Sequence, residues 1–144
     1  MPHRAALRMA ERISTAGNRG GTLCVVDGDE RERKSLADLL GTLGAPVLSF
    51  GSGEDLLGHL AETRIALLVC DVRLPGMSGI ELLRRIRDRG VSAPTILISG
   101  DGDLKTAVDA MRAGAVDFIE KPIIDRIVLR RAKSALESSP SATH

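Results

Sequence analysis

The chain has 144 residues and a mass of 15.3 kDa, which is enough for one ordinary domain and too little for a multidomain assembly. Its 43% hydrophobic and 27% charged residues are the usual mixture of a soluble globular protein and exclude a disordered or collagen-like chain. Twenty basic and nineteen acidic side chains leave a formal net charge of +1, which excludes a global positive field for holding DNA or an anionic membrane. The longest apolar run has about six residues, against the roughly 20 that span a bilayer, so no membrane segment is expected.

The first 20 residues are predicted to form a flexible basic arm. Their charged side chains are Arg4, Arg8, Arg12, Arg19 and Glu11, and four arginines against one glutamate give a local charge of +3. A docked amphipathic helix is the alternative that the pattern leaves open. The arm lacks the apolar stretch of a secretory signal, so a cytoplasmic location is expected.

Five short apolar runs are predicted to be strands, and they are Leu23–Val26, Val47–Phe50, Ile65–Cys70, Thr95–Ile98 and Val116–Ile119. Helical spacing of apolar residues appears between or after them, in residues 36–43, 80–86, 104–111 and 124–136. Continuous rather than alternating hydrophobicity is typical of strands that are covered on both faces, as in parallel sheets. The alternation of strands and helices therefore predicts an α/β domain over residues 21–137, followed by a disordered tail over 138–144.

Helix boundaries are marked by residues that suit helix ends. Ser78 and Asp103 stand where an N-cap oxygen would accept free backbone amides. Gly44 and Gly114 follow helical stretches, where a left-handed residue is favoured. These residues support the predicted order of elements.

Polar residues end several of the predicted strands. Asp27 follows the first strand, Asp71 the third and Ser99 the fourth; Asp29 and Lys121 lie close by in the chain. Because the carboxyl ends of parallel strands share one edge of a sheet, we expect these side chains to converge. Clustered carboxylates favour a hard cation such as Mg²⁺, and a carboxylate beside a metal and an ammonium group can act as a nucleophile toward phosphorus.

Four segments resemble the receiver domain of bacterial two-component response regulators, and they are Val25–Asp27, Cys70–Gly79, Ile98–Gly100 and Asp117–Pro122. The stretch Ala110–Pro122 is most similar to the nitrogen-fixation and nodulation regulator subgroup. The resemblance implies the flavodoxin-like (CheY-like) three-layer sandwich, with a five-stranded parallel sheet in the order 2-1-3-4-5.

The same resemblance implies a role for each polar residue at the strand ends. Asp71 would be the phosphoacceptor, served by a histidine kinase or a histidine phosphotransferase. Ser99 and Lys121 would contact the phosphoryl oxygens. Mg²⁺ would be held by Asp27, by Asp71 and by the backbone carbonyl of Arg73.

Two further features are expected from this resemblance and from the predicted strand ends. Ser99 and Phe118 would form the switch, with the ring filling the space that the moving hydroxyl vacates, and residues 103–119 would provide a face for a homodimer. Arg73 and Asp101 each lie two residues beyond a strand-end site residue, so they could bridge over the site and slow dephosphorylation.

One departure from the family pattern concerns the metal. Receivers usually have two adjacent acids after the first strand, whereas this chain has Asp27-Gly28-Asp29-Glu30. Gly28 replaces an acid that normally touches Mg²⁺, so weakened metal binding is expected. The flexibility of Gly28 is predicted to let Asp29 turn inward and restore part of the site.

The sequence favours a stand-alone receiver that switches a protein-interaction surface, with self-catalysed phosphoryl transfer and autodephosphorylation but no enzyme activity. A degenerate receiver that binds protein without phosphorylation is the main alternative. A haloacid dehalogenase-type phosphatase is a remote one, suggested by Asp27-Gly28-Asp29 and weakened by Arg31, which replaces the usual threonine or valine. Too few residues follow 136 for a DNA-binding domain, so no direct nucleic-acid partner is expected, and the downstream protein partner is unknown.

Overall fold

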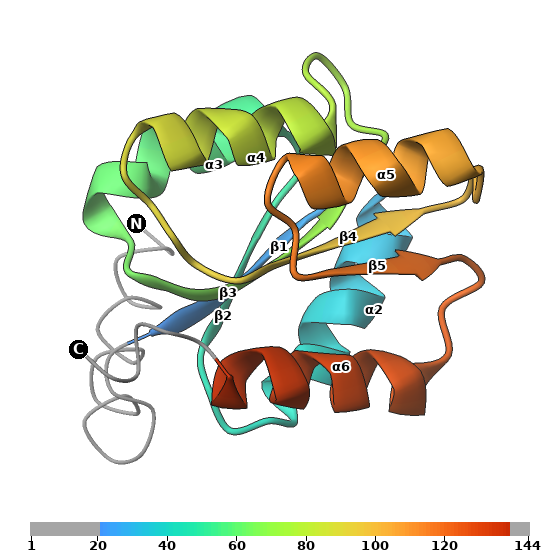
Figure 1. The fold of residues 1–144 in the computed structure, drawn as a ribbon. Helices are drawn as coiled ribbons and strands as arrows, with labels where there is room; N and C mark the ends of the chain where they lie inside the picture. Colours follow the sequence, from blue (N-terminus) through green and yellow to red (C-terminus); the bar gives the residue numbers. More distant parts are fainter. Residues whose placement is uncertain (1–20, 139–144) are drawn as a thin grey trace.

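The computed structural model describes residues 21–138. The predicted basic arm over 1–20 lies outside the described residues, as does the predicted tail apart from its first residue. Figure 1 shows a central sheet with helices packed on both of its faces.

The sheet has five parallel strands in the order β2-β1-β3-β4-β5. Their bounds are Thr22–Val26 for β1, Val47–Phe50 for β2, Ile65–Asp71 for β3, Thr95–Ser99 for β4 and Asp117–Glu120 for β5. Each predicted strand is present, although β5 begins one residue later than the apolar run suggested. The predicted three-layer fold and its strand order are confirmed.

Helices α2 and α6 cover one face of the sheet, and α3, α4 and α5 cover the other (Figure 1). Their bounds are Glu30–Gly41 for α2, Gly53–His59 for α3, Gly79–Asp88 for α4, Leu104–Arg112 for α5 and Asp125–Glu137 for α6, with a short 3-10 helix η2 at Leu60–Glu62. Helix α3 was not among the predicted apolar stripes. Alternate residues of each central strand face the two helical layers, so the sheet is buried on both sides.

The predicted helix ends are found in the structure. Ser78 Oγ accepts the amide of Glu81 at 3.1 Å, and Asp103 Oδ1 accepts the amide of Thr106 at 2.7 Å. Gly44 and Gly114 have φ values of 85° and 108°, which glycine adopts without a steric penalty. These caps fix where α4 and α5 begin, beside the carboxyl ends of the strands.

Candidate functional site

The carboxyl ends of β1, β3, β4 and β5 bring the predicted polar residues to one edge of the sheet. Asp71 is the last residue of β3 and Ser99 the last of β4, while Asp27 directly follows β1. Lys121 directly follows β5, and its ammonium nitrogen lies 2.7 Å from Asp71 Oδ2. Residues that are 50 positions apart in the chain therefore meet, as the strand pattern predicted.

Asp71 has both carboxylate oxygens engaged. Oδ1 accepts the backbone amide of Arg73 at 2.9 Å, and Oδ2 accepts the ammonium of Lys121. The residue is 5% exposed, so these donors rather than bulk water balance most of its negative charge. The carboxylate is thus held in a fixed orientation at the end of β3.

Asp27 is the most deeply buried acid of the site, at 1% exposure. Oδ1 accepts the amide of Asp29 at 2.8 Å, whereas Oδ2 has no hydrogen-bond partner among the described residues. Burial, the largest influence, and the nearby charges of Asp71 and Glu32 together raise the pKa of Asp27 to about 6, against the opposing hydrogen bond from the amide of Asp29. A cation beside this carboxylate would offset both the cost of burying its charge and the repulsion from the neighbouring acids.

Glu32 completes an acidic cluster that the sequence analysis did not predict. Asp27, Glu32 and Asp71 each offer a carboxylate oxygen, and these oxygens lie within 4.8 Å of one another. Oxygen ligands of this kind suit Mg²⁺, and the unpartnered Oδ2 of Asp27 supplies a free ligand atom, so the residues fit the metal that the resemblance implies. The capping-box spacing of Asp29 and Glu32 marks the start of the helix in the sequence, but it does not predict that Glu32 faces this cluster.

Asp29 is not in this cluster. Its Oδ1 accepts the amide of Glu32 at 3.0 Å and caps α2, and the residue is exposed. That amide is the largest influence holding the pKa of Asp29 below its ordinary value. The expectation that Asp29 turns inward is corrected here, because capping orients it toward the helix end and leaves Glu32 to face the site.

Lys121 joins two of the acids. Its Nζ lies 2.7 Å from Glu32 Oε2 and 2.7 Å from Asp71 Oδ2. Partial burial lowers the pKa of Lys121, but the hydrogen bonds and charges of the two carboxylates outweigh it and raise the pKa above its ordinary value. The ammonium is therefore charged at any physiological pH.

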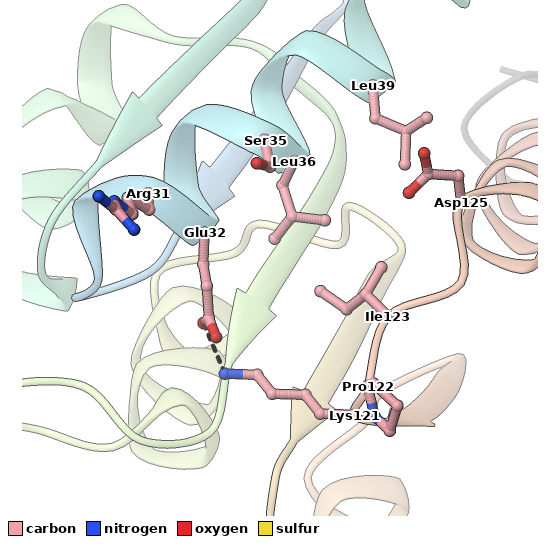
Figure 2. Close-up of a pocket in the computed structure, with 9 residues that line it drawn as sticks. All are labelled: Arg31, Glu32, Ser35, Leu36, Leu39, Lys121, Pro122, Ile123 and Asp125. Atoms are coloured by element: carbon pink, nitrogen blue, oxygen red, sulfur yellow. Dashed lines mark hydrogen bonds and ion pairs between the residues drawn. The ribbon is translucent and has the colours of Figure 1, made fainter.

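A cavity of about 620 Å³ adjoins this ion pair between α2 and the segment that leads from β5 into α6 (Figure 2). Arg31, Glu32 and Ser35 line it from α2, and Lys121 and Ile123 line it from the other side. Figure 2 shows the Glu32 side chain pointing from the helix toward Lys121. Glu32 is the member of the acidic cluster that lines this cavity, whereas Asp27 and Asp71 do not line it.

The remaining predicted residues lie at or near the same edge. Ser99 is 4% exposed; its Oγ donates to the carbonyl of Asp101 and accepts the Asp101 amide, both at 3.1 Å. The guanidinium of Arg73 forms an ion pair with the Asp101 carboxylate, and both side chains are exposed. Phe118 is partly buried against the core under α3, α4 and α5. The expected Arg73–Asp101 bridge is present, whereas the switch and dephosphorylation roles stay predictions.

Residues 23–133 match the response regulator receiver domain family, so the chain belongs to that family. It is 45% identical over 116 residues to the transcriptional regulatory protein FixJ of Rhizobium meliloti, covering 81% of this chain and 57% of the relative. It is 38% identical over 113 residues to nodulation protein W of Bradyrhizobium diazoefficiens, covering 78% and 50%. The predicted resemblance to nitrogen-fixation and nodulation regulators is confirmed. The chain spans about half the length of these relatives.

Solved structures agree with this assignment. The crystal structure of FixJ-N has a TM-score of 0.75 at 44% identity, over 82% of this chain and 94% of that one. The receiver domain of NtrX from Brucella abortus has a TM-score of 0.76 at 33% identity, over 81% and 99%. Neither comparison supports the phosphatase alternative. Among the described residues, no helix has the length and apolar character needed to cross a membrane.

Proposed function

We propose that Asp71 accepts a phosphoryl group from the phosphohistidine of a kinase or a phosphotransferase, and that the added charge switches a protein-interaction surface. The observation that carries this proposal is the 2.7 Å contact between Asp71 Oδ2 and Lys121 Nζ, beside two further carboxylates. A nucleophilic carboxylate, a fixed ammonium and a set of oxygen ligands are what phosphoryl transfer requires. Family membership supports the same assignment.

In the proposed step a carboxylate oxygen of Asp71 forms a bond to phosphorus while the bond from phosphorus to the histidine nitrogen breaks. The electron pair of that bond stays with the imidazole, which leaves as the neutral base once it holds a proton on its other nitrogen. Bound Mg²⁺, held by Asp27, Asp71 and the Arg73 carbonyl, would neutralise charge on the phosphoryl oxygens. Lys121 would exchange its contact with Asp71 for one with a phosphoryl oxygen, and Ser99 would donate its hydroxyl to another.

The switch would begin at Ser99. Within the described part of the chain its hydroxyl bonds to the backbone of Asp101 alone, so a phosphoryl oxygen on Asp71 would compete for it. If Ser99 moves inward, Phe118 follows into the vacated space and changes the edge of the sheet at β5. This edge adjoins an apolar surface, which we call the α5–β5 face, made of Leu104, Val108, Met111 and Val116.

We predict that phosphorylation shifts this receiver toward a homodimer through the α5–β5 face. Leu104, Val108 and Met111 share one face of α5 by their helical spacing, and with the nearby Val116 these exposed apolar side chains favour burial against a second copy. Light scattering with and without beryllofluoride, a phosphoryl mimic, should show the mass of a dimer only with the mimic. A Leu104→Ser variant should stay monomeric in both samples. A wild-type monomer in both samples would contradict the dimer.

We predict that Arg73→Ala shortens the life of the aspartyl phosphate about threefold to tenfold. The Arg73–Asp101 pair bridges two loops beside Asp71, so its loss opens the acyl phosphate to water. Decay after removal of the phosphodonor would be followed by intact-protein mass spectrometry. Arg84→Ala, an exposed arginine of α4 in its own surface pair, is the matched control and should decay like the wild type. An unchanged rate for Arg73→Ala would refute the shielding role.

The degenerate receiver stays an alternative because Gly28 replaces a metal-binding acid. Incubation with acetyl phosphate and Mg²⁺ separates the two functions, since a phosphorylated receiver gains the mass of one phosphoryl group and a protein-binding module gains none. A cytoplasmic location belongs to the proposal as well. On this proposal the chain performs only self-catalysed transfer and autodephosphorylation.

A further inference from the structure

We propose that Glu32 is a ligand of the Mg²⁺ site and replaces the acid that is missing at position 28. This inference rests on the proposed function, because it deepens the same site. It concerns a residue in the first turn of α2 and not the loop that directly follows β1. The site would then draw its acids from three places in the chain: the end of β1, the end of β3 and helix α2.

Asp27 supplies the independent sign that a ligand belongs here. Its side chain is almost fully buried, and Oδ2 has no hydrogen-bond partner among residues 21–138. A buried carboxylate oxygen without a donor is costly and persists where something outside the chain satisfies it. Because Glu32 and Asp71 each place an oxygen within 4.8 Å, a cation bound by Asp27 would meet all three.

The backbone around Gly28 explains why the acid is supplied from elsewhere. A Cβ at this position would lie 2.9 Å from Pro75 Cδ, closer than side chains normally approach. The residue is also exposed. A longer side chain at position 28 therefore requires Pro75 to shift, whereas Glu32 reaches the cluster without displacing any neighbour.

Two hydrogen bonds hold the start of α2 against Asp27, and a third caps the helix at Glu32; together they position Glu32. The amide of Asp29 donates to Asp27 Oδ1, and the guanidinium of Arg33 donates to the Asp27 carbonyl at 2.8 Å. Asp29 in turn caps the helix through the amide of Glu32 itself. Glu32 thus projects from a helix turn that is tied to another acid of the cluster.

Lys121 gives Glu32 a partner when no metal is bound. The 2.7 Å contact neutralises one acid of a cluster that would otherwise repel itself. Binding of the cation would then compete with Lys121 for the Glu32 carboxylate.

The test is a binding titration of the full chain with Mn²⁺, which substitutes for Mg²⁺ and is counted by electron paramagnetic resonance, without phosphodonor. Glu32→Gln removes the charge with little change of shape, and Glu32→Asp keeps the charge but withdraws it by one methylene. Both are expected to weaken Mn²⁺ binding about tenfold or more, since a direct ligand needs both charge and reach. Glu30→Gln, an exposed acid in the same helix turn, is the matched control and should change affinity less than about twofold.

The outcomes separate this inference from the proposed function. Wild-type affinity in Glu32→Gln, together with lost binding in Asp27→Asn, would overturn the role of Glu32 and leave the metal site intact. Wild-type affinity in Glu32→Asp alone would also overturn it, because a through-space charge effect would then suffice. Absence of Mn²⁺ binding in the wild-type chain would overturn both the inference and the Mg²⁺-dependent function. Circular dichroism of each variant establishes that the titrated protein is folded.

Discussion

Replacing Lys121 with methionine is expected to slow phosphorylation of Asp71 by about 100-fold or more. Lys121 contacts Asp71 and Glu32 at 2.7 Å each and would contact the incoming phosphoryl oxygens. Loss of one fixed donor to developing negative charge costs about 100-fold to 1000-fold in rate. The initial rate with acetyl phosphate and Mg²⁺, measured by mass spectrometry, checks this. Phosphorylation at the wild-type rate would show that the ammonium has no part in the transfer.

The same variant should bind divalent cations more tightly than the wild type. Without the ammonium, the carboxylates of Glu32 and Asp71 lose the one cationic partner that they have within residues 21–138 and favour a metal more strongly. Lys133→Met is the matched control, because Lys133 is exposed on α6 and carries the same charge. A slower transfer combined with tighter metal binding distinguishes loss of the ammonium from general damage to the site, which would weaken both.

Gly79→Ala is expected to destabilise the fold by about 3 kcal/mol, the upper end of the usual cost of overpacking. Gly79 begins α4, where an added Cβ would overlap the backbone carbonyl oxygen of Asp71 and press on Cys70 Sγ. Relief of this overlap requires α4 to move away from the end of β3, which would also displace the phosphoacceptor. Urea unfolding followed by circular dichroism measures the change in the free energy of unfolding.

Gly58→Ala provides the control for that substitution. Gly58 lies within α3, and a Cβ there would meet no atom within 4 Å. Alanine should therefore stabilise the protein by about 0.5–1 kcal/mol through its better helix propensity. Equal stability of Gly79→Ala and the wild type would contradict the close approach of α4 to Asp71.

The three central strands β1, β3 and β4 were predictable because they are largely buried on both faces and so read as short continuous apolar runs, whereas the edge strands β2 and β5 are only partly buried. Thr95–Ile98 is an example, since all of its residues are buried in the structure. Helix α3 was not predicted because it has seven residues and only Leu56 and Leu57 as large apolar positions within it. A stripe that short does not establish a helical period.

The residues of the site also divide into those that the sequence predicted and those that it did not. The meeting of Asp71 with Lys121 follows from parallel strands sharing one edge, which needs no knowledge of packing distances. The position of Glu32 depends on how α2 crosses the sheet, and that direction is set by tertiary packing of Leu36 and Leu40 against the core. Asp29 was placed in the cluster because its proximity in sequence was visible, whereas its capping bond was not.

The central claim is tested most directly by locating the phosphoryl group within the chain. Wild-type protein would be incubated with acetyl phosphate and Mg²⁺, and the labelled peptide identified by tandem mass spectrometry. The label is expected on Asp71, and it should be absent from Asp71→Asn and from a sample that contains EDTA. A label on Asp27, equal labelling of Asp71→Asn, or no label on the wild type would contradict the account.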